Sequence, residues 1–469
     1  MGRGGPPTYY MSFSLSLFFN KKVKNIYEFY IMTTSASTPT NSDIVYDVII
    51  MGGGIAGLYS AHQLIKKFPK KSILILEREN VLGGRIKTYT DKRMTVEAGA
   101  GRFHQKQIDT MSLITELGLA KHMFKIKSGD IYYDIHTKIP IDNPNKPLLE
   151  KLVTNSVLVE PNNLKNMSLV KYASMVLSND EIKTIEDTFG YYTELVTMNA
   201  SDCISLIREH LSPKNTFYIL QGGLKQIIDK LEENLQTHKN VTFLNKHQVS
   251  NIQKTTQYAQ QDAKRLPIYK VSFNHREITY LGKQIISALP KQVLEKMDYF
   301  KPIHRILHKS IHCGPLCRIY SVFPLKNGKA WFDNIPKFTT NNNLRIVIPI
   351  SSEHGVIMSS YTDNKYSKFW KDLYKKGGEH LLQKELVKLL KESTGIENIP
   401  PPIKTEIFYW DCGVGYWTVG TDSQEISTRI NQPFPGEQIF ICGEHFSHKD
   451  QQWIEGALET SKTVVSKIF

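Results

Sequence analysis

The chain has 469 residues, of which 41% are hydrophobic and 22% are charged, with a net charge of +14 and a pI near 9.2. This length and balance allow two or three domains with cores of their own and exclude a disordered or fibrous protein. The lysines are spread along the chain, and five scattered cysteines are too few for a disulfide framework, so we expect no nucleic-acid partner and a reducing, cytoplasmic compartment.

The first 41 residues differ in character from the remainder. A short apolar stretch at 11–19 precedes three lysines, and a Thr/Ser/Pro-rich segment follows at 33–43. The apolar stretch is too short to span a bilayer, and no other segment is apolar enough to do so. We expect residues 1–41 to be a mobile extension and the chain to have no transmembrane segment.

A strand, a glycine loop, a helix and a second strand are expected over residues 44–86. Gly52, Gly54 and Gly57 have G-x-G-x-x-G spacing, and Glu77 ends the second strand about 20 residues later. The three glycines permit a tight turn, close approach to a pyrophosphate and close helix packing. The start of the helix attracts phosphates, and the glutamate can accept hydrogen bonds from ribose hydroxyls. This pattern predicts a dinucleotide site that fits NAD as well as FAD.

The remaining chain alternates between helical and strand-like patterns. A hairpin is expected near residues 86–104 and mostly helices over 106–214. Two glycines then cap an amphipathic helix within 217–235. The later segments are a series of strands, a Lys/Leu-rich helix and a final strand–loop–helix, at 241–244, 269–273, 284–288, 317–361, 380–393 and 439–466.

Five separated blocks resemble the flavin-containing amine oxidase family, which includes monoamine, polyamine and L-amino-acid oxidases. The blocks are MGGGIAGL with Glu77, LGGRIKT, VEAGAGRFH, QGGLKQIIDKL and IFICGEHFSHKDQQWIEGALETS. Their order and spacing cover essentially residues 43–469. The match is therefore more specific than the glycine loop alone.

The resemblance implies an α/β fold, α+β as a whole, with a Rossmann-like FAD-binding domain. That domain is expected to be discontinuous, built from residues 42–105, 215–290 and 405–469. A substrate domain of mixed sheet and helix is expected from 106–214 and 291–404.

The resemblance also implies FAD, which family members hold either non-covalently or covalently, and the sequence at the attachment position favours non-covalent binding. Flavinylated relatives carry a cysteine directly before an aromatic residue, but Gly415 occupies that position here and Cys412 comes three residues too early. No metal ion is expected. The implied cofactor-binding residues are Gly52, Gly54, Ile55, Ala56, Gly57, Glu77, Arg78, Gly84, Arg85, Gly101, Arg102, Val249, Gly443, Glu444, Trp453, Ile454 and Ala457.

Four residues are expected on the substrate side. Tyr416 and Trp453 match the two aromatics that face each other across the amine in this family. Arg318 stands where many relatives have a lysine linked through water to flavin N5, and arginine does not replace lysine equivalently. Arg102 matches the arginine that holds the substrate carboxylate in amino-acid oxidases, although a purely structural role is also open.

These residues predict oxidation of a small amine or amino acid by hydride transfer to flavin N5. The imine would hydrolyse to an aldehyde or keto acid, with O2 reduced to hydrogen peroxide. Alternatives are an L-amino-acid oxidase, a flavoenzyme with a non-amine substrate such as a desaturase or protoporphyrinogen oxidase, or an FAD-binding protein without turnover. The sequence does not identify the amine, the oligomeric state or the physiological acceptor.

Overall fold

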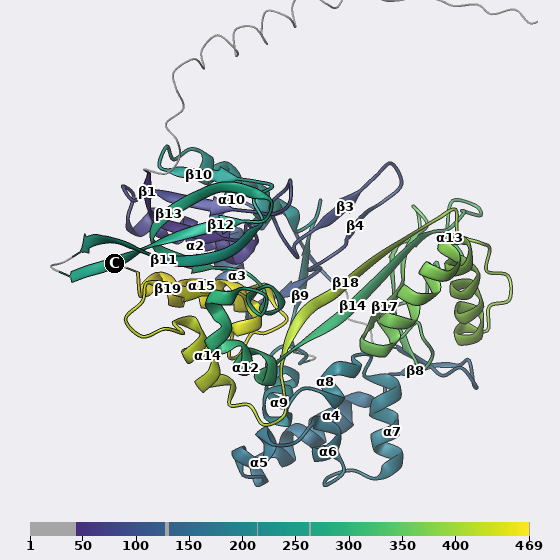
Figure 1. Ribbon diagram of the computed structural model, residues 1–469. Helices are drawn as coiled ribbons and strands as arrows, with labels where there is room; N and C mark the ends of the chain where they lie inside the picture. The colour runs from purple at the N-terminus through teal and green to yellow at the C-terminus, as the bar shows by residue number, and fades with distance from the viewer. Residues whose placement is uncertain (1–43, 127–130, 213, 262–263, 469) are drawn as a thin grey trace, which may run out of the picture. The chain divides into compact units, whose positions relative to one another are not determined.

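The computed structural model describes residues 44–126, 131–212, 214–261 and 264–468, whose arrangement is shown in Figure 1. The expected extension over residues 1–41 lies outside the described residues. Val45–Phe469 form one compact unit, and its described strands build two seven-stranded sheets and two smaller ones. The mixed α/β class predicted from the sequence is confirmed.

The first sheet has the Rossmann-like arrangement expected from the glycine loop. Its parallel strands are, in spatial order, β10 (Val241–Leu244), β2 (Ile73–Leu76), β1 (Val45–Met51), β13 (Arg276–Ser287) and β19 (Ile439–Ile441). The antiparallel strands β12 (Lys264–Phe273) and β11 (Val249–Gln261) continue from β13. In this register Ile50 of β1 lies between Ile75 and Ile286. The sheet therefore gathers strands from distant parts of the chain.

Both faces of the first sheet are covered, which explains why its central strands are continuously apolar. One core cluster joins alternate residues of β1 and β2 to α2 (Ile55–Lys67), α3 (Ile108–Glu116), α10 (Lys225–Gln236) and α15 (Ile454–Ser466). The other cluster, on the opposite face, joins the intervening residues of β1 and β2 to β11, β12, α12 (Lys301–Ser310) and α14 (Ser423–Asn431).

The second sheet is mostly antiparallel. Its order is β18 (Lys404–Trp417), β14 (Ile311–Val322), β17 (Val356–Asp363), β16 (Ile346–Ser351), β15 (Phe338–Thr340), β7 (Ile131–Tyr133) and β8 (Pro140–Asp142). The long helix α13 (Asn364–Thr394) packs on it through buried Trp370, Leu382 and Leu386. Gly377 and Gly378 leave helical geometry and kink α13 in its middle.

Short helices form a third core, which also receives Tyr416 from the second sheet. They are α4 (Asn145–Asn155), α5 (Pro161–Lys165), α6 (Leu169–Ala173), α7 (Asn179–Thr188), α8 (Tyr192–Val196) and α9 (Ala200–Glu209). The mostly helical pattern of residues 106–214 predicts this group. The smaller strands and helices are β3 (Thr88–Thr90), β4 (Thr95–Glu97), β5 (Phe103–His104), β6 (Met123–Lys125), β9 (Phe217–Leu220), α11 (Lys291–Leu294) and the 3-10 turns η1 (Ala120–His122), η2 (Ser156–Leu158), η3 (Asp298–Phe300) and η4 (Glu444–Phe446).

One expected domain boundary differs from the strand pairing. The sequence analysis assigned residues 405–469 to the FAD-binding domain, but β18 pairs along the length of β14 in the second sheet. The part of this segment that belongs to the nucleotide-binding sheet and the helices on its faces begins after β18, with α14, β19 and α15. The pairing thus favours a boundary just after β18, because a strand belongs to the sheet that satisfies its backbone groups.

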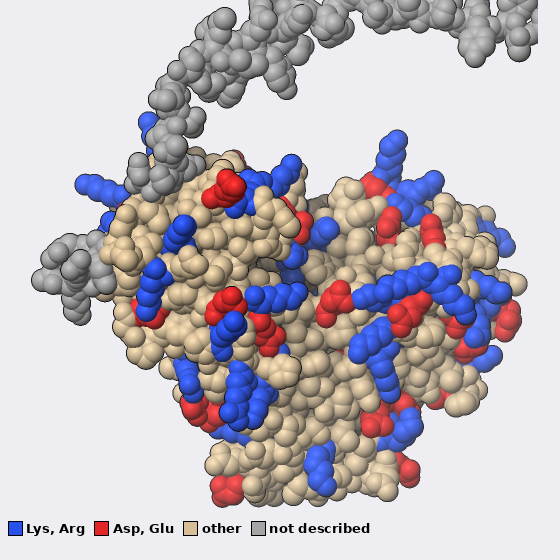
Figure 2. All heavy atoms as spheres, viewed as in Figure 1, with Lys and Arg blue, Asp and Glu red and all other residues tan. Residues whose placement is uncertain are grey.

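Charged side chains are interspersed on the face shown in Figure 2, where lysines and arginines lie over many elements and alternate with acids. This distribution agrees with the dispersed lysines of the sequence. Within the described residues, each helix is either too short or too polar to cross a membrane.

The packing of α2 on β1 generates a stability prediction. Gly57→Ala should lower the free energy of unfolding by more than about 2 kcal/mol, because the new Cβ would collide with the Gly52 carbonyl oxygen and push α2 away from β1. Gly54→Ala is the matched control, since a Cβ there meets backbone atoms only at 4.0 Å. Urea denaturation of both variants measures the difference, and equal losses would contradict the proposed clash.

Candidate active site

The loop between β1 and α2 is a tight turn free of side chains. Gly52 has a φ of 108°, in the region that favours glycine, and Gly57 lets the helix approach the strand. The N-terminus of α2 has Gly54 as its cap residue and receives no side-chain hydrogen bond there. The first helical residues, Ile55 and Ala56, therefore present backbone N–H groups that suit a phosphate.

Glu77 lies buried at the end of β2, beside this turn. Its Oε2 accepts a hydrogen bond of 2.8 Å from the Gly53 N–H, and its Oε1 accepts one of 2.9 Å from the Glu79 N–H. Val249, also buried, begins β11, and the loop before it bonds to the Glu77 carbonyl over 2.8 Å. Arg78 has a different setting: its side chain is 62% exposed, with Nε 3.1 Å from Glu79.

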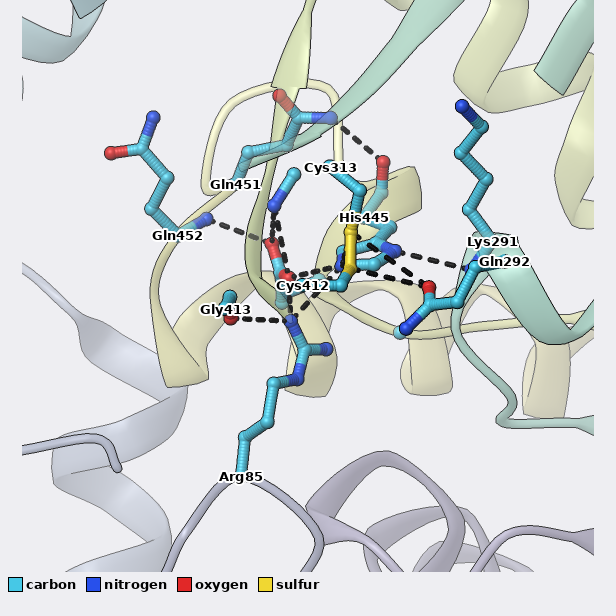
Figure 3. A network of polar contacts seen from close by, with 12 residues as sticks. Arg85, Lys291, Gln292, Cys313, Cys412, Gly413, His445, Gln451 and Gln452 are labelled. Atoms are coloured by element: carbon cyan, nitrogen blue, oxygen red, sulfur yellow. Dashed lines mark hydrogen bonds and ion pairs between the residues drawn. A yellow bond between two sulfur atoms is a disulfide. The ribbon is translucent and has the colours of Figure 1, made fainter. Parts of the chain in front are cut away.

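Two further glycines, Gly83 and Gly84, pack against the turn that joins β1 to α2. The Gly83 N–H donates to the Gly53 carbonyl over 2.9 Å, and a Cβ on Gly84 would lie 3.5 Å from the Cα of Gly54. Both residues of the pair have positive φ values, 120° and 58°. This packing places Arg85 at the end of the turn, from where its side chain reaches the C-terminal part of the chain (Figure 3).

Arg85 forms an ion pair with Glu444, and its Nη1 also donates to the Gly413 carbonyl over 2.9 Å. Burial alone would raise the pKa of Glu444, but the charge of Arg85 and the contact with His445 outweigh burial and hold this pKa well below its usual value. The Gln452 N–H donates to the same carboxylate over 2.9 Å. Glu444 is therefore a fixed anion paired with a cation from the glycine turn.

The segment after β19 brings the last expected cofactor residues together. Gly443 has a φ of 130°, and its N–H donates to the Thr460 hydroxyl of α15 over 2.9 Å. Trp453 precedes α15 and gives its N-terminus no side-chain cap. Ile454 and Ala457 lie buried in the first turn of the helix, within the same core as α2. The N-termini of α2 and α15 thus belong to one packed unit.

Arg318 extends from β14 toward Gly101. A Cβ on Gly101 would lie 2.8 Å from the Arg318 guanidinium, so the two residues are in contact. Nη1 of Arg318 donates to the Glu97 carbonyl over 3.1 Å, and the guanidinium lies 4.7 Å from the centre of the Tyr361 ring. Tyr320 donates to the same carbonyl over 2.9 Å. Residue 318, which the sequence analysis aligned with the lysine of the family, is therefore an arginine whose charge is fixed by the Glu97 carbonyl and the Tyr361 ring.

Arg102 and Trp453 are brought together. The Arg102 guanidinium lies 4.5 Å from the centre of the Phe217 ring and 6.0 Å from that of Trp453, and its Nη2 is 3.3 Å from the Tyr191 hydroxyl. Trp453 stacks on His210 with ring centres 5.5 Å apart. The Tyr191 ring in turn contacts the Tyr361 ring, which lies beside Arg318. Arg102 and Arg318 therefore border the same aromatic group, which consists of Tyr191, Tyr361 and Trp453.

Tyr416 lies in a neighbouring group and is only 1% exposed. Its ring is 6.1 Å from that of His312. Burial, followed by the nearby Glu194 and Asp363 carboxylates, raises the pKa of the Tyr416 hydroxyl well above its usual value. The facing pair of Tyr416 and Trp453 stays a prediction, because the rings that contact Trp453 belong to His104, His210 and Phe217.

Sequence reasoning missed the residues that connect these groups, namely Tyr191, Glu194, Tyr361 and Asp363. Asp363 accepts hydrogen bonds from the backbone N–H groups at the start of α8, with distances of 3.0 and 2.6 Å. Glu194 is buried, and its Oε2 has no hydrogen-bond partner among the described residues. Burial and then Asp363 raise the pKa of Glu194 well above its usual value. No local motif marks these residues, because their neighbours come from distant strands.

Two of the five cysteines form a disulfide that the sequence analysis did not predict. Cys313 and Cys412 form a disulfide, with Cα atoms 5.1 Å apart, between β14 and β18. The other three cysteines are buried free thiols. A single cross-link is still far from a disulfide framework, but its sulfur atoms lie beside His445, which in turn contacts Arg85 (Figure 3).

Comparison with known proteins supports the resemblance to flavin-containing amine oxidases that the sequence blocks indicate. The family model for flavin containing amine oxidoreductases matches residues 162–468, and that for an NAD(P)-binding Rossmann-like domain matches residues 50–117. An uncharacterised protein of Acanthamoeba polyphaga mimivirus is 22% identical over 486 residues, which cover 90% of this chain and 94% of that protein. Protoporphyrinogen oxidase 2 of Arabidopsis thaliana is 28% identical over 112 residues, 24% of this chain and 21% of that protein.

Among solved structures, wild-type putrescine oxidase bound to putrescine has a TM-score of 0.70 and 14% identity, with 91% of this chain and 99% of that chain covered. This likeness confirms the fold. The family match covers most of the chain, including the segments that carry Arg318, Tyr416, Glu444 and Trp453. The chain therefore belongs to the flavin-containing amine oxidoreductase family, whose members are flavin-dependent oxidoreductases.

Proposed function

We propose that the protein is an FAD-dependent amine oxidase that uses O2 and releases hydrogen peroxide. The observation that carries this proposal is the aromatic group between Arg318 and Arg102, in which Tyr361, Tyr191 and Trp453 are in contact with the two guanidinium groups or with each other. Such π faces can orient a small amine and exclude water from it.

The residues present fit FAD, the cofactor that the family implies. The glycine turn has no side chain to obstruct a pyrophosphate, and the N-terminus of α2 lacks a side-chain cap. Glu77 would hold the ribose hydroxyls, and Arg85 would meet the phosphates. When bound, FAD supplies the acceptor for the hydride removed from the amine α-carbon.

Non-covalent binding is part of this proposal. Gly415 occupies the position at which flavinylated relatives have their cysteine, and a Cβ there would lie 3.0 Å from His445. The next cysteine, Cys412, is already joined to Cys313. Residue 415, where flavinylated relatives attach the cofactor, therefore offers no thiol, and the thiol of Cys412 is already used in the disulfide.

The chain's own residues would supply orientation and electrostatics. Trp453, with Tyr416 as its proposed partner, would orient the neutral amine, while the surrounding burial keeps water away from the reacting carbon. The N-terminus of α15 carries a partial positive charge, which stabilises negative charge on a reduced cofactor. Arg318 adds a permanent cation in contact with Gly101.

A second candidate is oxidation of L-amino acids. The Arg102 guanidinium lies 4.5 Å from the centre of the Phe217 ring and 6.0 Å from that of the Trp453 ring, in the same aromatic group as the proposed amine site. A planar guanidinium in this setting suits a bidentate contact with a substrate carboxylate. The competing interpretation is that Arg102 only supports the surrounding rings.

The first prediction concerns turnover. Purified protein should be yellow, release FAD on acid denaturation, lose its flavin absorbance when an amine is added without oxygen, and form peroxide when oxygen is present. A panel of monoamines, polyamines and L-amino acids measures the substrate class. Released FAD with unchanged absorbance throughout the panel would instead support an FAD-binding protein without turnover.

Arg102→Ala separates the two substrate classes. If amino acids are the substrates, their kcat/KM should fall about 10- to 100-fold, because a charge-assisted contact is worth about 1.5–3 kcal/mol. Turnover of simple amines should change by less than about threefold. Arg102→Lys is the control that keeps the charge and removes the planar fork. Equal losses for amines and amino acids would assign Arg102 a structural role.

Arg318→Lys tests the departure from the family pattern. A lysine at this position is a compact charge that water can link to the cofactor, so reoxidation by O2 should become about tenfold faster. Stopped-flow mixing of the anaerobically reduced variant with oxygen measures this step alone. Arg318→Met provides the uncharged comparison, and slower reoxidation in the lysine variant would contradict the interpretation.

A further inference from the structure

The disulfide between Cys313 and Cys412 lies at an irregularity in the second sheet. Gly314 pairs with Val414, whereas Leu316 pairs with Trp410, so residues 411–413 of β18 face Pro315 alone. Proline has no N–H with which to hold this bulge by a strand hydrogen bond. The covalent link from Cys313 to Cys412 is therefore a principal constraint on the bulge.

The same bulge contacts the residues expected to hold FAD. The Gly413 carbonyl accepts a hydrogen bond of 2.9 Å from Arg85, and the Gly415 N–H donates to Glu444 over 3.3 Å. Arg85 and Glu444 also pair with each other. A change in the position of the bulge would therefore change the Arg85–Glu444 pair (Figure 3).

The surroundings of the two sulfur atoms favour thiol chemistry. Nε2 of His445 lies 3.7 Å from Sγ of Cys313 and 3.6 Å from Sγ of Cys412, and the Arg85 guanidinium is 3.0 Å from the same Nε2. The Arg85 cation is paired with the Glu444 carboxylate, which also lies 3.1 Å from Nε2 of His445, so the sulfurs face an ion pair and an imidazole and not a free positive charge. The imidazole nitrogen beside the two sulfurs can exchange a proton with a thiol, and the thiolate is the reactive form. Cys313 and Cys412 are only partly buried, so a small oxidant can reach them.

The free cysteines provide a contrast. Cys203, Cys317 and Cys442 are fully buried, and burial raises the pKa of each thiol, to about 11 for Cys442. Their thiols stay protonated and inaccessible. Reactive sulfur is therefore concentrated at the pair beside the expected flavin site.

The geometry argues against a metal ion at the same three residues. Cys313, Cys412 and His445 are close enough to share one ion. However, the Lys291 N–H points at Nδ1 of His445 over 3.2 Å, and Nε2 is already in contact with the Arg85 guanidinium and the Glu444 carboxylate. A histidine that binds a metal normally donates its other N–H to an acceptor, which is the opposite arrangement.

We propose that Cys313 and Cys412 form a reversible thiol–disulfide site that sets how tightly the chain holds FAD. Hydrogen peroxide closes it, and a thiol reductant reopens it by disulfide exchange, in which two reductant thiols become a disulfide and the two cysteines recover their protons. One thiolate attacks the peroxide O–O bond and becomes a sulfenic acid, and water leaves after a proton is taken up. The second thiol attacks that sulfur, the S–S bond forms, and a second water leaves. Two thiols and one peroxide thus give one disulfide and two waters, with two electrons passed from sulfur to oxygen.

The closed form fixes the bulge and, through Gly413, the Arg85–Glu444 pair. The open form releases the bulge, so we expect FAD to bind about 5- to 150-fold more weakly, the usual range of coupling between two sites. That the peroxide comes from the protein's own turnover rests on the proposed function. The site itself needs only peroxide from any source.

The experiment compares holoprotein in two states, reduced with dithiothreitol or treated with one equivalent of added hydrogen peroxide. Alkylation and peptide mapping should show that peroxide joins the peptides of Cys313 and Cys412 with a mass loss of about 2 Da, the two thiol hydrogens of the balanced step. Fluorescence of released FAD during equilibrium dialysis measures retention. Cys313→Ser and Cys412→Ser should each abolish the difference between the two states, while Cys203→Ala should keep it.

Full alkylation of both cysteines after peroxide, or equal FAD retention in the two states, would overturn the proposal. So would stoichiometric zinc binding by the reduced protein that is lost in Cys412→Ser. Because peroxide is added and no amine is needed, the measurement is independent of turnover. A protein that oxidises no amine but still shows redox-dependent FAD retention would refute the proposed function and leave this inference intact.

Discussion

The ion pair between Arg85 and Glu444 joins residues that are 359 positions apart in the sequence. Arg85 follows the glycine pair that is hydrogen-bonded to the first nucleotide-binding turn, and Glu444 follows β19 of the same sheet. A buried carboxylate needs a cation beside it, so neither residue can be satisfied unless both ends of the chain reach this place. The pair therefore couples completion of the fold to formation of the cofactor site.

Two adjacent strands, β14 and β18, extend this constraint to the substrate side. β18 bonds to the ion pair through Gly413 and carries Tyr416 three residues later. β14 holds Arg318 against Gly101 and Cys313 against Cys412. The strands belong to the second sheet, yet their side chains and carbonyl groups reach the residues that follow the glycine turns. One strand pair thus links the cofactor cradle to the aromatic group.

The sequence predicted the local part of this arrangement well. Glycines, apolar runs and a terminal acid identify the Rossmann-like unit, because each part of that motif depends on neighbours close in sequence. The aromatic group could not be predicted in full. Tyr191, Tyr361 and Asp363 meet only because the start of α8 packs against the end of β17, about 170 residues later in the chain. The disulfide was missed for the same reason, since its cysteines are 99 residues apart.

The contacts around residue 318 explain why an arginine fits there better than a lysine. Its planar guanidinium donates to the Glu97 carbonyl and at the same time stacks near the Tyr361 ring. A lysine ammonium can make a point contact but cannot provide both a directed fork and a stacking plane. The packing therefore suits a fixed, planar cation better than an ammonium on a mobile chain. In the proposed site this permanent charge would favour electron transfer into FAD, and the proposed reoxidation by O2 would have to proceed without a group that gives up a proton at this position.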